Sequence, residues 1–382
     1  MKKNLFILAA AALCFAACSS DETIAVNEGL ADANTISFRP LMNNVTRAAD
    51  INATTLETTG FYVSARKHSD ASEYFTDAAY TVYTTPSSVK TWTCANKYYW
   101  PSDDSELDFF AYSPKAVGEG KNAQITAHSA YNSFEVTPAT TANTQVDLIF
   151  ANANQKKKST DNSGVVLNFR HAESKIVINL KNTNPSLTFT VGDVVIGNVK
   201  DKGQFTYTAE SDSKLKYADW AWAGASNTSY TQTVTTASAY STSTPAQAGV
   251  DMILVPQTLT NATTYHDGEN AAVFDGSYIT VQLKIQNAVN SSYIVGGEST
   301  WQVALWPLPA TQWNPGMKYT YTVDLAGGGY FPTNKNGTSS DLDPILEGFE
   351  IKFVTVSVDD WTDFDGNDVT EGIQPIPVSG GI

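Results

Sequence analysis

The spacing of apolar residues constrains this chain more than any other feature of its sequence. Beyond the first residues, apolar side chains recur at every second position in short runs, of which residues 278–285 alternate most cleanly. A period of two predicts β-strands with one face in a core and the other in water. Gly, Asn, Asp, Ser and Pro separate the runs, and no sustained period of 3.6 appears. The sequence therefore predicts an all-β fold of antiparallel strands with little helix.

A polar stretch divides the predicted strands into two groups. Residues 152–164 contain three consecutive lysines among Asn, Ser and Thr, which is the composition of a linker. We expect an N-terminal domain at residues 48–151 and a C-terminal domain at residues 165–363. Two layers of antiparallel sheet hide the apolar faces of half-buried strands, so each domain is predicted to be a β-sandwich.

The first residues predict export. Lys2 and Lys3 precede an apolar run, residues 5–17, which suits a signal peptide but is shorter than the ~20 residues of a membrane-spanning helix. The run ends in two alanines and Cys18, and this resembles the lipobox of bacterial lipoproteins. We predict a lipoprotein signal peptide at residues 1–17 with the lipid on Cys18; the alternative is an ordinary signal peptide with an incidental cysteine. The acidic pair that follows resembles a signal for the outer face of the outer membrane, or belongs to a solvated linker.

Charge and cysteine content limit the partners and the chemistry. The formal net charge is −15, and it is unchanged beyond Ala48 because basic and acidic residues are equally numerous before that point. An acidic surface repels phosphate backbones, so no nucleic-acid partner is expected. If Cys18 carries lipid, Cys94 has no partner in the mature chain and no disulfide framework forms.

No catalytic site, metal site or cofactor is predicted. No nucleophile elbow, phosphate loop or paired-histidine motif appears. The adjacent carboxylates at 103–104 and 359–360 would point apart in a strand, which disfavours a hydrolase. His171 follows a predicted strand and is expected to be structural. The remaining histidines lie far apart, without a second metal ligand at a useful spacing; they are His68, His128 and His266.

An ordered set of short motifs, spread over nearly the whole chain, resembles the fimbrillin-like proteins, the subunits of the type V pili of the Bacteroidales. The motifs are residues 36–39, 45–48, 60–63, 99–101, 107–114, 147–151, 165–176, 256–257, 313–321 and 354–361. The resemblance implies two transthyretin-like β-sandwich domains and no enzymatic activity. It also implies a lipoprotein precursor on the outer membrane and a stalk or tip pilin that assembles with neighbouring subunits into a fimbria. Such a fimbria supports adhesion to a ligand on a host or bacterial surface.

The resemblance further implies a maturation cut. A trypsin-like or arginine-specific protease would cleave between Arg47 and Ala48 and remove a leader, residues 18–47. The other three arginines precede a proline or lie in or beside predicted strands, where a protease cannot reach them. From composition alone, Arg47 is equally well an exposed residue of a linker.

The leader contains the predicted removable first strand, with Ile36 and Phe38 on one face. Taking a strand out of a sandwich uncovers apolar surface and unpaired backbone groups, which an extended segment of a neighbouring subunit can fill. The resemblance places this donor strand in the C-terminal tail, residues 364–382. The candidate apolar residues of the donor strand are Ile373, Ile376 and Val378.

Two alternatives stay open. Pro375 and Pro377 lack an N–H and fit only an edge strand or an unpaired stretch, so the tail could also have no role in assembly. The second alternative is a surface glycan-binding lipoprotein. Trp220 and Trp222 lie in a polar stretch, residues 207–249, that is predicted to be a loop, where an indole could stack on a sugar ring.

Overall fold

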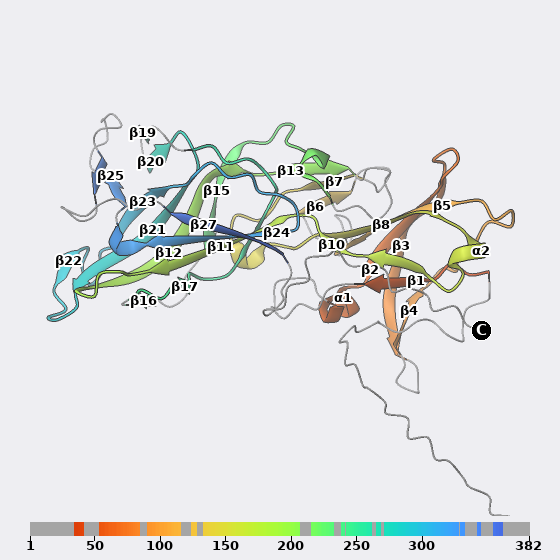
Figure 1. Ribbon diagram of the computed structural model, residues 1–382, viewed down its shortest axis with the longest axis horizontal. Coiled ribbons are helices and arrows are strands. Elements are labelled where there is room, and N and C mark those ends of the chain that lie inside the picture. Colours follow the sequence, from red (N-terminus) through yellow and green to blue (C-terminus); the bar gives the residue numbers. More distant parts are fainter. Residues whose placement is uncertain are drawn as a thin grey trace, which may run out of the picture.

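The chain folds into two β bodies that lie side by side along the long axis of the molecule (Figure 1). The computed structural model describes residues 34–41, 53–84, 90–115, 124–127, 133–206, 215–232, 238–240, 242–261, 265–268, 271–327, 329–332, 342–344 and 354–361. The all-β prediction is confirmed. The short helices in this part of the chain are α1 (Ala53–Thr59), α2 (Lys158–Asp161) and the 3-10 turns η1 (Ala142–Thr144), η2 (Tyr217–Asp219) and η3 (Leu325–Gly327). No described helix is long and apolar enough to cross a bilayer.

The first body is built on a six-stranded antiparallel sheet. In spatial order its strands are β10 (Arg170–His171), β8 (Ile149–Lys156), β5 (Leu107–Ser113), β2 (Phe61–Lys67), β3 (Glu73–Thr84) and β4 (Lys90–Cys94). The alternation in β2 places Phe61, Val63 and Ala65 on the buried inner face, and Phe109 of β5 lies on the same face. A period of two has therefore built half of a sandwich core.

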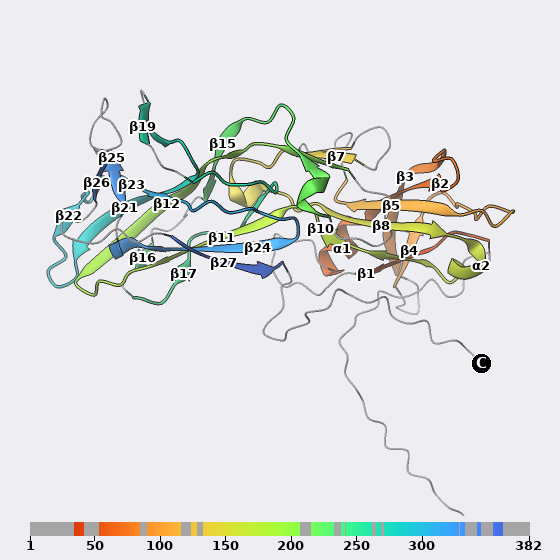
Figure 2. The same ribbon diagram turned by 45° about the horizontal axis from the view of Figure 1, so that its top comes forward.

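A much smaller layer covers this face. It consists of the parallel pair β1 (Phe38–Leu41) and β9 (Val165–Asn168). In both views, β1 and α1 lie on the same side of β8 (Figure 1 and Figure 2). Because the layer has so few strands, each of them covers a large share of the core.

The predicted linker at residues 152–164 is wrong. Asn152 and Asn154 continue β8 and are buried, while β9 and β10 complete the first body, so the chain enters the second body only after His171. The polar composition misled the prediction because both asparagines lie on the outer face of β8, opposite the apolar core. The two bodies therefore meet near residue 172, not before residue 165.

The second body contains one sheet of five strands and one of eight. One sheet runs β17 (Ala246–Gln247), β11 (Ser174–Lys181), β24 (Met317–Asp324) and β27 (Thr355–Asp360), with β18 (Met252–Leu254) also on β11. The other runs β15 (Asn227–Gln232), β12 (Leu187–Lys200), β21 (Tyr278–Asn287), β23 (Gln302–Pro307), β25 (Tyr330–Pro332) and β26 (Leu342–Pro344). In addition, β16 (Ser238–Tyr240) pairs with β12, β22 (Tyr293–Val295) pairs with β21, and β19 (Tyr265–Gly268) forms a hairpin with β20 (Ala271–Phe274). A large apolar cluster fills the space between the sheets, and the alternating residues of β21 contribute to it.

A four-stranded sheet joins the two bodies. It runs β14 (Trp220–Ala221), β13 (Gly203–Thr206), β7 (Ser133–Val136) and β6 (Ile125–Ala127), so strands from both halves of the sequence share it. Its core packs Phe134 against Phe205 and Phe205 against Trp220. The predicted loop at residues 207–249 therefore contains strands, and the indole of Trp220 is core.

Candidate functional site

The first described segment, residues 34–41, runs through the small layer of the first body, between β9 and residues 98–100. Along one edge, β1 pairs with β9 in the register Phe38 to Val165. The N–H of Val165 donates to the Ser37 carbonyl over 2.9 Å. The segment is therefore attached to β9 by a parallel ladder.

The opposite edge of the segment pairs with residues 98–100. The Ile36 N–H donates to the Tyr98 carbonyl at 2.8 Å, and the Trp100 N–H donates to the Asn34 carbonyl at 2.9 Å. An antiparallel bridge joins Thr35 to Tyr99 between these two bonds. Residues 34–41 therefore lie between β9 and residues 98–100, two parts of the chain that are distant in sequence.

Alternate side chains of the segment enter the core. Ile36 and Phe38 are 2% and 4% exposed, and Pro40 is buried behind them. The Phe38 ring makes edge contacts with Tyr80 and Phe109, at centroid distances of 5.0 and 5.2 Å. Burial of Ile36 and Phe38 contributes about 1.5–3 kcal/mol each. Both residues of the predicted first strand thus lie in the core of the first body.

The floor beneath Phe38 is aromatic and uncharged. Phe61 and Tyr80 stack with their centroids 5.3 Å apart, and the Trp92 ring lies 4.8 Å from that of Phe61. Burial raises the pKa of the Tyr80 phenol far above its usual range, so Tyr80 is neutral at physiological pH. Such a surface suits an apolar side chain and no other kind.

Gly164 lets the segment lie close to the start of β9. It has a φ of +113°, and a Cβ placed on it would lie 3.1 Å from Arg39 Cγ and 3.3 Å from Ser37 Oγ. Arg39 Nε donates to the Gly164 carbonyl at 3.2 Å. A side chain here would need a strained backbone and would push against β1.

The arginines differ in their structural setting. Arg39, Arg66 and Arg170 lie in β1, β2 and β10, where ladders hold the backbone. Arg47 and Ala48, the predicted cleavage pair, lie outside the described residues. The same holds for Cys18 and for the donor candidates Ile373, Ile376 and Val378.

The last described residue, Trp361, is anchored where the two bodies meet. It is 4% exposed, and its N–H donates to the Gly316 carbonyl at 2.9 Å. The buried Lys175 ammonium lies 5.3 Å from the indole centroid and 3.2 Å from Asp251 Oδ2. The chain that leads to the tail therefore starts from a fixed point beside the junction.

A buried carboxyl group lies at the same junction. Glu173 is fully buried, and the Leu148 N–H donates to its Oε2 at 3.0 Å. Burial raises the pKa of Glu173 well above its usual range, and nearby Asp147 raises it further. The protonated form of Glu173 is therefore favoured more in the folded protein than in the unfolded chain.

The two indoles that could stack on a sugar ring, those of Trp220 and Trp222, make contacts within the protein. Trp220 is 4% exposed and lies in the core that joins the bodies. Trp222 is half-buried, donates its Nε1–H to the Pro256 carbonyl at 2.8 Å and packs beside Tyr217. The interpretation of Trp220 as an exposed platform is therefore wrong.

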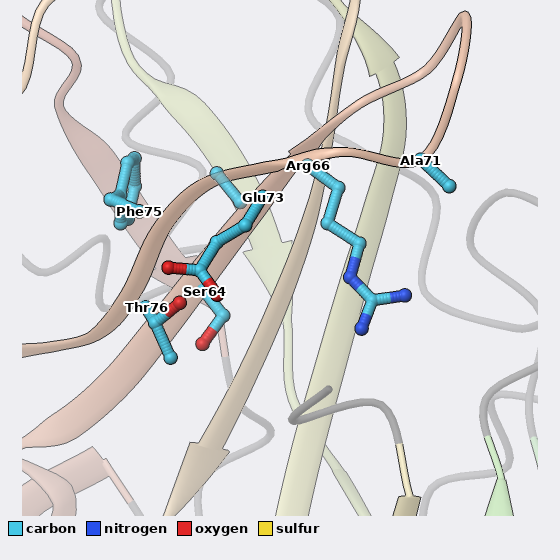
Figure 3. A pocket seen from close by; sticks show the side chains of 7 residues that line it. Ser64, Arg66, Ala71, Glu73, Phe75 and Thr76 are labelled. Atoms are coloured by element: carbon cyan, nitrogen blue, oxygen red, sulfur yellow. The ribbon is translucent and has the colours of Figure 1, made fainter. Parts of the chain in front are cut away.

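A small hollow lies where β2 and β3 meet at two irregularities of their ladder. Its volume is about 180 Å³, below the roughly 300 Å³ at which small-molecule sites begin. Figure 3 shows the Arg66 guanidinium pointing away from the Glu73 carboxylate, so the polar groups do not converge on one point. In the part of the chain that the structure describes, no cluster of three or more His, Cys, Asp or Glu could hold a metal ion.

The sequence predicts Ile36 and Phe38 as buried residues of a first strand, but it does not indicate the two segments that pair with this strand, β9 and residues 98–100. The sequence predicts residues 165–169 in the second domain, whereas β9 belongs to the first body and pairs with β1. The role of residues 98–100 as the opposite edge was also missed. The alternation of Val165 and Leu167 was visible in the sequence, but nothing in it indicated a parallel partner so far away.

Comparisons with known proteins identify the family to which the chain belongs. A solved structure of a fimbrial protein from Bacteroides vulgatus is 14% identical to the chain, with a TM-score of 0.49, and the alignment covers 86% of this chain and 100% of that chain. A protein provisionally assigned to cell adhesion from Bacteroides uniformis is 16% identical, with a TM-score of 0.41, and the alignment covers 87% of this chain and 100% of that chain. A protein with the same provisional assignment from Parabacteroides distasonis is 10% identical, with a TM-score of 0.45, and the alignment covers 87% of this chain and 98% of that chain. None of the curated proteins compared with the chain matches it. The family described as fimbrillin-like matches residues 46–344, well over half of the chain. The chain therefore belongs to the fimbrillin-like family, the structural subunits of cell-surface fimbriae.

Proposed function

We propose that this subunit is exported as a lipoprotein through Cys18, cut between Arg47 and Ala48, and polymerised by exchange of its first strand for the tail of another copy. The observation that carries the proposal is the position of residues 34–41. This short segment near the N-terminus fills the centre of the smaller sandwich layer, with Ile36 and Phe38 buried. In this proposal the lipid holds the precursor at the outer membrane, and the mature subunit has a structural role with no catalysis.

Removal of the segment would create a binding groove. The rings of Phe61, Tyr80 and Phe109 would lose the cover of Phe38. Backbone groups on residues 98–100 and on β9 would lose their partners at the same time. Uncovered apolar surface and unpaired strand edges favour capture of another extended segment.

The place of the cut supports the proposal. Arg47 follows β1 closely in sequence, whereas the other three arginines are held in strands. A cut after Arg47 would break the covalent link between β1 and the rest of the first body. The freed leader would then stay in place by non-covalent contacts alone until another strand replaced it.

The tail has the length that exchange requires. Residues 362–382 can span up to roughly 70 Å when extended at ~3.3 Å per residue. They start from Trp361, which is anchored at the junction of the two bodies. A tail of this reach could enter the groove of the next subunit while its own body stays folded.

The test uses the purified full-length chain and its Arg47→Ala variant. Treatment with an arginine-specific protease should release the leader of the unaltered chain and yield ladders on gels and filaments in electron micrographs. Arg47→Ala should stay monomeric. Arg47→Lys is the matched control, because trypsin should cut it and the arginine-specific enzyme should not. Ladders from Arg47→Ala equal to those of the unaltered chain would rule out this maturation route.

A further inference from the structure

The groove already accommodates a proline in β1. Pro40 is buried within this strand, opposite Leu167 of β9. The bond from the Val165 N–H to the Ser37 carbonyl sets the phase of the parallel ladder, in which every second residue bonds to the partner strand. In this arrangement β9 forms backbone hydrogen bonds with Ser37, Arg39 and Leu41. The backbone nitrogens of Phe38 and Pro40 point away from β9. A proline at position 38 or 40 therefore costs no bond to β9.

The tail repeats the pattern of the strand that it would replace. Residues 36–41 read Ile-Ser-Phe-Arg-Pro-Leu, and residues 373–378 read Ile-Gln-Pro-Ile-Pro-Val. Both begin with isoleucine, have proline at the fifth position and end in an aliphatic residue. The two prolines of the tail are two residues apart, which is the spacing of the positions whose N–H groups β9 does not use.

Resting on the strand exchange proposed above, we propose that residues 373–378 of a second copy enter the groove in the register of residues 36–41. Ile373 takes the buried place of Ile36. Pro375 and Pro377 take the places of Phe38 and Pro40, and Gln374, Ile376 and Val378 bond to β9 in a parallel ladder. Pro375 and Pro377 are thus compatible with a donor strand in this register, because β9 needs no N–H group at these two positions.

A register shifted by one residue fits the groove less well. Pro377 would then lie at the position of Arg39, where the Val165 carbonyl requires an N–H donor. Gln374 would enter the place of Ile36, which is 2% exposed and lined by apolar residues. A buried acceptor without a donor and a buried amide in an apolar pocket both weaken binding.

The proposed register leaves one pocket underfilled. Phe38 contacts three aromatic rings, and the smaller Pro375 cannot reach all of them. Pro375→Phe should therefore tighten assembly, because the new ring restores the contacts that Phe38 makes. In the shifted register the same side chain would point out of the groove and change nothing.

The first test compares two single substitutions in the tail of the full-length chain, Ile373→Asp and Ile376→Asp, after cleavage at Arg47. A labelled synthetic peptide of residues 370–380 carrying each change measures binding to the cleaved chain. In the proposed register, Ile373→Asp should weaken peptide binding about tenfold or more and abolish ladders, because the carboxylate would enter an apolar pocket. Ile376→Asp should change binding less than about threefold, since its side chain faces away from the core.

The second test traps the register directly. With the native cysteines replaced by serine, Val166→Cys is combined with Ile376→Cys or with Pro377→Cys. Residue 39 is the partner of Val166 in β1, so the proposed register brings residue 376 beside it, at a strand spacing that a disulfide can bridge. The shifted register brings residue 377 there.

The outcomes separate this inference from the strand exchange on which it rests. Loss of ladders with Ile373→Asp and a disulfide to residue 376 support the register. Loss with Ile376→Asp instead, or a disulfide to residue 377, would overturn the register while the exchange stands. Ladders indifferent to both substitutions would overturn the tail as the occupant. If the cleaved unaltered chain forms no ladder, both the exchange and the register fall.

Discussion

The imidazole of His171 lies parallel to the indole of Trp361, with ring centroids 3.8 Å apart and 7° between the planes. His171 Nδ1 lies 2.9 Å from Asp147 Oδ1, which holds the imidazole in this orientation. His171 is the last residue of β10 in the first body, and Trp361 follows β27 in the second. One stacked pair thus links the junction of the bodies to the point where the tail begins.

Trp361→Ala should lower the free energy of unfolding by about 3–5 kcal/mol, because it removes a buried indole and leaves a cavity. Urea denaturation followed by far-UV circular dichroism measures the change. Trp301→Ala is the control, since that indole is only partly buried, above Lys284 on the second body. A loss for Trp361→Ala no greater than that for Trp301→Ala would contradict the anchoring role.

Phe38→Ala in the uncut chain should destabilise the first body by about 3–5 kcal/mol, because a fully packed aromatic ring is removed. The neighbouring Ser37→Ala should cost less than about 1 kcal/mol, since the Ser37 side chain is only partly buried and lies off the core face. After cleavage at Arg47, leader release from Phe38→Ala should also be faster. Equal denaturation midpoints for the two variants would show that the core does not depend on Phe38.

Gly164→Ala should destabilise the chain by about 1–3 kcal/mol, because φ is +113° and the new Cβ would press on Arg39. Gly224→Ala is a matched control with a positive φ of +68° and open space, since its nearest neighbour is Lys202 Nζ at 3.9 Å. Adding Arg39→Ala should recover part of the loss at Gly164 and none at Gly224. Urea midpoints of the single and double variants give the coupling, and additive effects would show that β1 is not crowded there.

Glu173→Gln should stabilise the chain more at pH 8 than at pH 5. The pKa of Glu173 is raised in the folded state, so the folded chain binds its proton more tightly than the unfolded chain does. The contribution of Glu173 to stability therefore falls as pH rises above the unfolded pKa and towards the raised one. Glutamine keeps the shape and remains neutral, which removes this loss.

Urea midpoints of both proteins at the two pH values measure this effect. The two proteins differ only at residue 173, so the change with pH in the difference between their midpoints reports on the Glu173 carboxyl group. A difference between the variants that does not change with pH would contradict the raised pKa.

Part of the fold could be predicted because strand periodicity is local. In β21 the predicted alternation places Ile279, Val281, Leu283 and Ile285 in the core, each 0% exposed. Ile36 and Phe38 were found in the same way, from two apolar residues with a serine between them. Burial of every second side chain follows from the geometry of a strand, whichever strand pairs beside it.

The partners of each strand could not be predicted, because pairing depends on residues far apart in sequence. The partner of β1 is β9, more than a hundred residues away, and the polar face of β8 was mistaken for a linker. The polar neighbours of Trp220 in the sequence predict a loop, yet its indole packs on Phe205 from another strand.

Neighbouring residues alone fix the all-β character of the chain and the buried face of the first strand, because both follow from the alternation of side chains along a strand. Tertiary contacts fix three further features: the parallel pairing of this strand with β9, the accommodation of a proline within it and the anchoring of Trp361 at the junction. These three features come from contacts between segments that the chain brings together only when it folds.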